Sequence, residues 1–308
     1  MKRFEHVIVA GIDGAGAFIQ NAKTPCMDAI FASGARTFRA FASRPSISAE
    51  CWGSMLTGVS PALHGLTNEW ISQHAYPTDS RFPTLYKRVR GAYPDAAVAA
   101  YCDWSPLVTG IVEADAGVDC LSLRDAELIG PACEYIRSRK PAFMFVHMDS
   151  VDGAGHKFGY GTPQHLNQIE VCDRYVQLLY SACRDAGMLD STLFLVLSDH
   201  GGTCDERPEG GYSGSHGGWT EAERRISFLA AGPGIQAGEI GDMNIRDTAA
   251  IVLYALGIDM PAFDPNGWTA QLPENLFAGV QVPYIDISGE TGAVPRVSRV
   301  RHTSQTAE

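Results

Sequence analysis

The chain has 308 residues, a formal net charge of −11 and a pI near 5.3. Its 45% hydrophobic and 19% charged content is that of an ordinary globular protein, and the length suits one large α/β enzyme domain. Because the charge balance is acidic and no basic block occurs, binding to a nucleic-acid backbone is disfavoured as a main function.

The N-terminal half is predicted to alternate buried strands with helices. We expect strands over 5–12, 35–42 and 97–102, and helices over 22–33, 49–56 and 81–92. Residues 104–122 show no clear pattern and are expected to form a surface excursion.

The C-terminal half continues this alternation. We expect helices over 124–140, 163–188 and 247–256, and strands over 142–148, 192–197 and 226–232. Pro131 should kink or split the first of these helices. Together the elements predict an α/β fold with a mostly parallel central sheet and helices on both faces. A single domain is expected over 1–308, in which 259–308 is irregular and ends in a disordered tail.

No segment of the sequence predicts a membrane partner. Residues 7–10 form too short an apolar run for a signal peptide, and no run reaches the ~18 apolar residues that a membrane helix needs. The eight cysteines are scattered without a CxxC pair, so we expect reduced thiols that serve mostly in packing. These features predict a cytoplasmic protein.

Residues suited to divalent metal ions follow three predicted strands or lie in a glycine-rich loop. They are Asp13, Asp152, His156, Asp199, His200 and His216. Open α/β sheets place ligands at the carboxyl ends of their strands. Aspartate and histidine suit zinc and similar ions. Taken singly, each residue is as consistent with a strand cap or a loop as with a metal site.

Ser48 stands just before the predicted helix 49–56, which should end at Gly58. It would either cap this helix or act as a nucleophile at the helix N-terminus, where the dipole favours an anion. Ser46 is the nearest rival nucleophile.

The motifs together resemble the alkaline phosphatase superfamily, and within it the type I phosphodiesterase/nucleotide pyrophosphatase branch. The matching segments are Gly11–Gly14, Leu56–Gly58, His64–Gly65, Asp152–His156, Ser198–Gly201 and Ser215–Gly217. They occur in the family's order over most of residues 5–220. The resemblance implies an alkaline-phosphatase-like fold and a hydrolase of small-molecule phosphate esters.

The resemblance also implies two divalent metal ions, zinc or manganese. One ion would be held by Asp152, His156 and His216. The other would be held by Asp13, Ser48, Asp199 and His200. Ser48 would attack phosphorus and form a phospho-enzyme intermediate, which water then hydrolyses.

The chain departs from the family at the nucleophile segment. The branch usually has threonine as nucleophile with an asparagine nearby, whereas this chain has Ser48 and no asparagine directly after it. Asn68 and Cys51 are the predicted substrate-binding replacements. A sulfatase is disfavoured because the segment Ser48–Trp52 lacks the required x-Pro-x-Arg pattern.

A phosphodiesterase is the preferred function. No lysine or arginine lies between Ser48 and Arg81 to bind a monoester dianion, although Arg44 or a distant arginine would serve if the fold brought it close. Trp52 and Trp70 would either pack against a second ester group or belong to the core. The alternatives are a phosphomonoesterase on the same site and a non-catalytic binding protein of the same fold.

Overall fold

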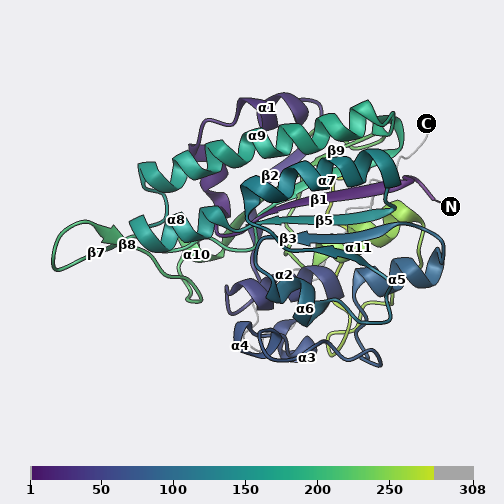
Figure 1. The fold of residues 1–308 in the computed structure, drawn as a ribbon, viewed down its shortest axis with the longest axis horizontal. Coiled ribbons are helices and arrows are strands. Elements are labelled where there is room, and N and C mark those ends of the chain that lie inside the picture. Colours follow the sequence, from purple (N-terminus) through teal and green to yellow (C-terminus); the bar gives the residue numbers. More distant parts are fainter. Residues whose placement is uncertain (1, 281–308) are drawn as a thin grey trace, which may run out of the picture.

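An eight-stranded sheet runs through the centre of the described residues (Figure 1). The computed structural model describes residues 2–280, so the predicted disordered tail lies outside the described residues. The strand order is β10-β2-β9-β6-β1-β5-β3-β4. The strands are β1 (His6–Ile12), β2 (Ala35–Phe41), β3 (Val98–Cys102), β4 (Asp119–Leu121), β5 (Phe143–Met148), β6 (Thr192–Leu197), β9 (Arg225–Ala231) and β10 (Gly238–Glu239).

The sheet is mostly parallel, as predicted. Only β9 is antiparallel to its neighbours, β2 and β6, whereas the other pairs are parallel. A separate two-stranded ribbon, β7 (Asp205–Glu206) with β8 (Tyr212–Ser213), extends from the body (Figure 1). It lies beside α8 (Ser150–Phe158) and α10 (Glu221–Arg224).

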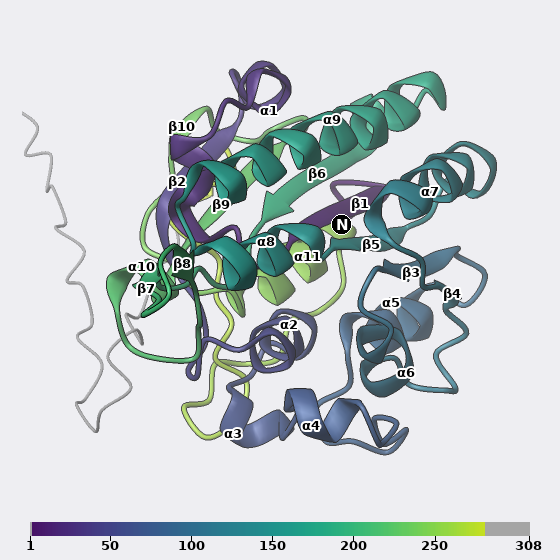
Figure 2. The same cartoon turned by 60° about the vertical axis from the view of Figure 1, so that its left-hand side comes forward.

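Helices cover both faces because the central strands are apolar on both sides. In β1, Val7 and Val9 enter one core, and Ile8 and Ala10 enter the other. One face is covered by α1 (Pro25–Ile30), α7 (Asp125–Arg139) and α9 (Pro163–Asp185), and the opposite face by α2 (Ser48–Thr57), α5 (Leu85–Ala92), α6 (Pro106–Ile111) and α11 (Asp247–Leu256) (Figure 2).

Short elements complete the described chain. They are α3 (Pro61–His64), α4 (Asn68–Ile71), α8 (Ser150–Phe158), α10 (Glu221–Arg224) and the 3₁₀ turns η1 (Gly16–Asn21) and η2 (Leu189–Ser191). Residues 259–280 contain no helix or strand. Within residues 2–280, no helix combines the length and the apolar character needed to cross a bilayer.

The prediction for residues 104–122 was wrong, and the predicted split of a helix at Pro131 does not occur. The segment 104–122 contains α6 and β4, and Leu107 and Ile111 are buried one helical turn apart. Pro131 lies inside α7 without ending it. Pro131 is exposed, as is Glu127 one turn earlier, so the Glu127 carbonyl that loses its helical partner lies on the solvent side.

The topology brings distant segments to one edge of the sheet. Strands β6, β1 and β5 are adjacent and parallel, so their carboxyl ends lie together. Because β9 runs the other way beside β6, its first residue lies at that same edge. The residues that follow β6, β1 and β5 and the residues that precede β9 can therefore share one site.

Candidate metal and phosphate-ester site

All six predicted metal ligands are positioned by this edge of the sheet. Asp13 follows β1. Asp152 and His156 lie in α8, which follows β5, and Asp199 and His200 follow β6. His216 precedes α10 and β9. The aspartates and His200 are buried, whereas the His156 side chain is 47% exposed. The site is thus closed at its base and open beside His156.

One cluster of side chains surrounds Ser48. The His200 Nε2 atom lies 3.4 Å from Asp13 Oδ1 and 3.2 Å from Asp199 Oδ2. The Ser48 hydroxyl oxygen lies 3.4 Å from Asp13 Oδ1 and 3.2 Å from His200 Nε2. Asp199 Oδ2 is buried and has no hydrogen-bond partner within residues 2–280. Such an oxygen is costly to bury unless a cation accompanies it.

The second cluster lies beside the first. His156 Nε2 is 3.1 Å from Asp152 Oδ2 and 3.2 Å from His216 Nε2. Two nitrogen lone pairs at this separation repel, so a proton or a metal ion is needed there. The rings of His200 and His216 stack with centroids 3.8 Å apart and thereby join the two clusters.

The three histidines are oriented in the same way. The Nδ1 atom of His156 is 3.0 Å from the Gly214 carbonyl oxygen, and that of His200 is 2.9 Å from the Gly201 oxygen. His216 Nδ1 is 2.9 Å from the Ser46 oxygen. Since a carbonyl can only accept, each ring carries a proton on Nδ1 and presents Nε2 to the site. Metal-binding histidines are commonly fixed in this way.

Like each histidine, each of the three carboxylates uses one side-chain atom for a hydrogen bond to the protein and leaves another facing the site. Asp13 Oδ2 lies 2.8 Å from His147 Nε2 and accepts a hydrogen bond from Trp52 Nε1 at 2.9 Å. The other two accept at Oδ1: Asp199 from the Gly14 amide at 3.0 Å and Asp152 from the Tyr160 hydroxyl at 2.5 Å. One oxygen of each carboxylate is therefore held by the protein, and the other is available to a metal ion.

The electrostatics of the site also favour a cation. Burial raises the pKa of Asp199 well above its usual range, and the charge of Asp13 adds to this effect. The hydrogen bond to Asp152 raises the pKa of His156 to about 9. A proton therefore occupies His156 near neutral pH unless a metal ion displaces it, and metal binding should strengthen as the pH rises. The residues present fit two divalent ions.

Comparison with known sequences assigns the chain to a family. The family model of the type I phosphodiesterase/nucleotide pyrophosphatases matches residues 7–88 and 70–207. These ranges cover more than half of the chain and include all the predicted site residues except His216. The chain belongs to the type I phosphodiesterase/nucleotide pyrophosphatase family.

The curated relatives are distant members and much longer proteins. An ectonucleotide pyrophosphatase/phosphodiesterase of Caenorhabditis elegans is 23% identical over 63% of this chain and 28% of its own length. A GPI ethanolamine phosphate transferase 2 of Aspergillus fumigatus is 22% identical over 76% of this chain and 31% of its own length. The chain thus spans about a third or less of the curated relatives that it matches.

Solved structures confirm the alkaline-phosphatase-like α/β fold. Murine ectonucleotide pyrophosphatase/phosphodiesterase 5, in an inactive form in complex with AMP, superposes with a TM-score of 0.68 at 14% identity, over 84% of this chain and 97% of that one. The lipoteichoic acid synthase LtaP of Listeria monocytogenes gives 0.64 at 14% identity, over 88% and 75% of the two chains. Both likenesses concern the fold alone.

In this phosphodiesterase-family chain, Ser48 does not cap its helix. Ser48 is the first residue of α2, Ile47 is the N-cap, and no side chain makes a capping hydrogen bond. The Ser48 hydroxyl instead points into the ligand cluster. The predicted helix end is confirmed, because Gly58 has a left-handed conformation with φ 77°.

The two predicted substrate-binding residues have different surroundings in the structure. Asn68 Oδ1 accepts a hydrogen bond from the Ala49 amide at 2.9 Å, so the Asn68 amide group lies beside the first turn of α2. Cys51 is fully buried, and its Sγ lies 3.9 and 3.8 Å from the carbonyl oxygens of Ser43 and Pro45. The predicted contact of Cys51 with substrate is therefore wrong, because the backbone of residues 43–45 packs over the Cys51 side chain.

The two tryptophans of this segment differ in exposure, because Trp52 is fully buried and Trp70 is partly exposed. Trp52 donates a hydrogen bond to Asp13, so it is a core residue that orients a predicted metal ligand. Trp70 is half-buried against the core and stacks on His74 with ring centroids 5.2 Å apart. Arg44 stacks over the ring of Trp219.

Sequence reasoning missed His147 and Tyr160, which hold two of the carboxylates. His147 interrupts the apolar strand β5, and a buried imidazole requires a partner, so the strand itself contained the signal. Burial would lower the pKa of His147, but its hydrogen bond with Asp13 prevails and raises the pKa to about 9. His147 thus donates a hydrogen bond through Nε2 to Asp13 at the base of the site.

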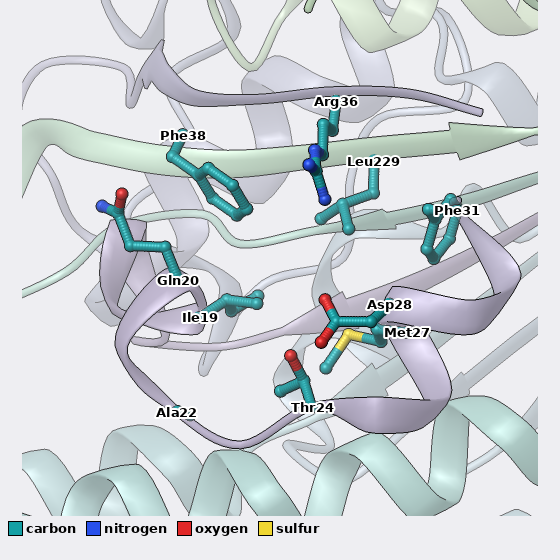
Figure 3. A pocket seen from close by; sticks show the side chains of 10 residues that line it. All are labelled: Ile19, Gln20, Ala22, Thr24, Met27, Asp28, Phe31, Arg36, Phe38 and Leu229. Carbon is teal, nitrogen blue, oxygen red and sulfur yellow. The ribbon is translucent and has the colours of Figure 1, made fainter. Parts of the chain in front are cut away.

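One clear cavity of the described chain lies apart from this site. A cavity of about 190 Å³ lies between η1, α1 and the strands β2 and β9 (Figure 3). Its lining combines apolar side chains with the polar residues Gln20, Thr24, Asp28 and Arg36, and it includes none of the predicted ligands. It therefore takes no part in the proposed chemistry.

Proposed function

We propose that the chain is a two-metal hydrolase of small-molecule phosphate esters, with a preference for diesters, and that Ser48 is its nucleophile. The position of the Ser48 hydroxyl carries this proposal. It lies within 3.4 Å of Asp13 Oδ1 and His200 Nε2, among ligand atoms that the protein leaves available. It also stands at the positive end of the ten-residue helix α2, which favours an oxyanion.

The ligand set suits two ions, zinc or manganese. Asp152, His156 and His216 would hold one, and Asp13, Ser48, Asp199 and His200 would hold the other. When bound, such ions lower the pKa of a coordinated hydroxyl group and neutralise charge on phosphate oxygens. The unpartnered oxygen of Asp199 supports this assignment.

The residues of the chain then provide a two-step reaction. The Ser48 hydroxyl gives up its proton to solvent and its oxygen bonds to phosphorus in line with the leaving alkoxide. The phosphorus–oxygen bond to that alkoxide breaks, and the alkoxide takes up a proton from solvent, so that no net proton is gained or lost. The Ser48 ester is cleaved in the second step by water. Asn68, which lies beside the start of α2, would contact a phosphate oxygen through its amide nitrogen.

The proposed preference for diesters rests on the lack of positively charged residues in the sequence that follows Ser48. Residues 49–80 contain no lysine or arginine, and the Asn68 amide is neutral. A monoester dianion would lack a guanidinium partner there. One relative is a GPI ethanolamine phosphate transferase, so an alcohol should also be tested, in place of water, as the acceptor of the phosphate group.

The test measures kcat/KM for bis-p-nitrophenyl phosphate and p-nitrophenyl phosphate with the same metal at one pH. We expect faster diester turnover, loss of activity on chelation and recovery with zinc or manganese. A tenfold preference for the monoester, about 1.4 kcal/mol in transition-state binding, would establish the phosphomonoesterase instead. Turnover of neither ester by metal-loaded protein would favour a binding protein, and faster product release with added glycerol would indicate transfer.

A further inference from the structure

The ring of Tyr160 fills a space that three glycines leave open. Tyr160 is 3% exposed. A Cβ atom added at Gly155, Gly202 or Gly214 would lie 2.4 Å from a carbon of this ring. The three glycines belong to α8, to the loop after β6 and to the segment after β8. Because separate segments all make room for one ring, its position is determined from several sides.

The Tyr160 hydroxyl controls one oxygen of a predicted metal ligand. It donates a hydrogen bond of 2.5 Å to Asp152 Oδ1, and Asp152 Oδ2 lies 3.1 Å from His156 Nε2. A phenol is protonated near neutral pH, so the Tyr160 hydroxyl is the donor and the carboxylate is the acceptor.

The same ring also contacts the two histidines of this cluster. The Tyr160 ring meets His156 edge to face, with centroids 5.8 Å apart, and meets His216 in the same way at 6.4 Å. One side chain therefore touches all three predicted ligands of one ion.

We propose that Tyr160 is a positioning residue that limits Asp152 to a single metal-binding oxygen and so makes this ion site selective for zinc. The proposal rests on the two-metal function proposed above. With Oδ1 held by the phenol, Asp152, His156 and His216 offer one oxygen and two nitrogens. Catalytic zinc sites use three protein ligands of this kind and keep a fourth position open. Manganese and magnesium are better served by additional oxygen ligands.

The main test removes only the hydroxyl group. Zinc and manganese binding to the metal-free full chain would be measured by isothermal titration calorimetry for the wild type and for Tyr160→Phe. We expect two zinc ions to bind the wild type. In Tyr160→Phe, one of the two zinc affinities should fall about 10- to 100-fold, as for other losses around metal ligands. Manganese affinity should fall less, because the freed Oδ1 can also bind the metal.

Tyr76→Phe is the matched control. Tyr76 is a buried tyrosine whose hydroxyl donates at 2.9 Å to the Phe82 carbonyl, between α4 and α5. The substitution removes one buried hydroxyl without touching the metal ligands. Both zinc affinities should remain at the wild-type values, and equal losses in the two variants would overturn the proposal.

Two glycines of α8 provide a second comparison that retains the hydroxyl. A Cβ at Gly155 would meet the Tyr160 ring, whereas a Cβ at Gly153 has nothing within 4 Å. Both substitutions should favour the helix by similar amounts. We therefore expect Gly155→Ala to weaken zinc binding at one site and Gly153→Ala to leave it unchanged.

The outcomes separate this inference from the function on which it rests. A wild-type chain that binds no divalent metal would overturn the proposed function. A wild type that binds two zinc ions, with unchanged affinities in Tyr160→Phe, would overturn the role of Tyr160 alone.

Discussion

At the scale of single residues, the site is defined by how each ligand is restrained. Every predicted histidine ligand donates through Nδ1 to a backbone carbonyl, and every predicted carboxylate ligand has one oxygen occupied by a protein donor. The remaining atoms point toward one another. Such restraint fixes geometry before any substrate arrives, which is where much of the catalytic advantage of a preorganised site originates.

Ser48→Ala tests the residue that this arrangement surrounds. We expect turnover to fall on the order of 10³-fold or more, because a nucleophile acts with its neighbours as a unit. The free energy of unfolding should change little, since the Ser48 side chain makes no capping hydrogen bond. Steady-state rates and urea unfolding curves would measure the two effects.

Ser46→Ala is the control for this substitution. The Ser46 hydroxyl accepts from the Gly217 amide at 3.1 Å, so it supports the segment next to His216 and does not face the nucleophile position. We expect moderate loss of activity. An inactive Ser46→Ala beside an active Ser48→Ala would transfer the nucleophile to Ser46.

At the scale of elements, one end of α2 faces the candidate site and the other end packs against the C-terminal segment. The first residue of α2 is Ser48, the proposed nucleophile, and its last turn closes at Gly58. The Gly58 carbonyl accepts from the Thr269 and Ala270 amides at 3.2 Å, and the Trp268 ring covers the glycine. The irregular C-terminal segment therefore packs on the C-terminal end of α2.

Gly58→Ala and Gly65→Ala test this packing as a pair. Both glycines end a helix with positive φ, 77° and 69°. A Cβ at Gly58 would lie 2.3 Å from Trp268, whereas a Cβ at Gly65 has nothing within 4 Å. The left-handed conformation should cost each variant about 1 kcal/mol, and overpacking should cost Gly58→Ala a further ~1–3 kcal/mol. Equal losses of unfolding free energy would refute the contact.

At the scale of the whole molecule, two histidines are buried on opposite faces of the sheet. His64, on the α2 side, accepts from the Leu66 amide at 3.0 Å, and His165, in α9, accepts from the Gly161 amide at 3.2 Å, in each case through Nδ1. Burial lowers the pKa of each to about 4. Both rings are therefore neutral in the folded chain near neutral pH.

These histidines predict a loss of stability in acid. As the pH falls, each of these histidines binds a proton near pH 6.5 in the unfolded chain but only near pH 4 in the folded chain. Their contribution to the free energy of unfolding is therefore complete above pH 6.5 and declines as the pH falls toward 4. From pH 7.5 to 5, wild type should lose roughly 2 kcal/mol more than His64→Gln, whose side chain does not titrate. Urea unfolding of metal-free protein would measure this, and identical pH slopes would contradict it.

The amino-acid sequence by itself determined the layout of the chain and most of the candidate site. Apolar runs predicted the central strands, because strands buried on both faces must be apolar throughout. The residues after those strands predicted the ligands, because parallel strands end at one edge. His216 was predicted as a histidine in the glycine-rich loop that follows the strand 192–197, and its assignment to a particular ion came from the resemblance to the family.

Only the tertiary structure decided which side chains support the ligands and which face away. The contacts of Tyr160 with Asp152, and of His147 with Asp13, join segments whose approach no local pattern encodes. The same holds for Cys51, which the backbone of residues 43–45 covers. Local patterns determine the faces of single elements, whereas the packing of one element on another determines which polar atoms meet, and that depends on every element at once.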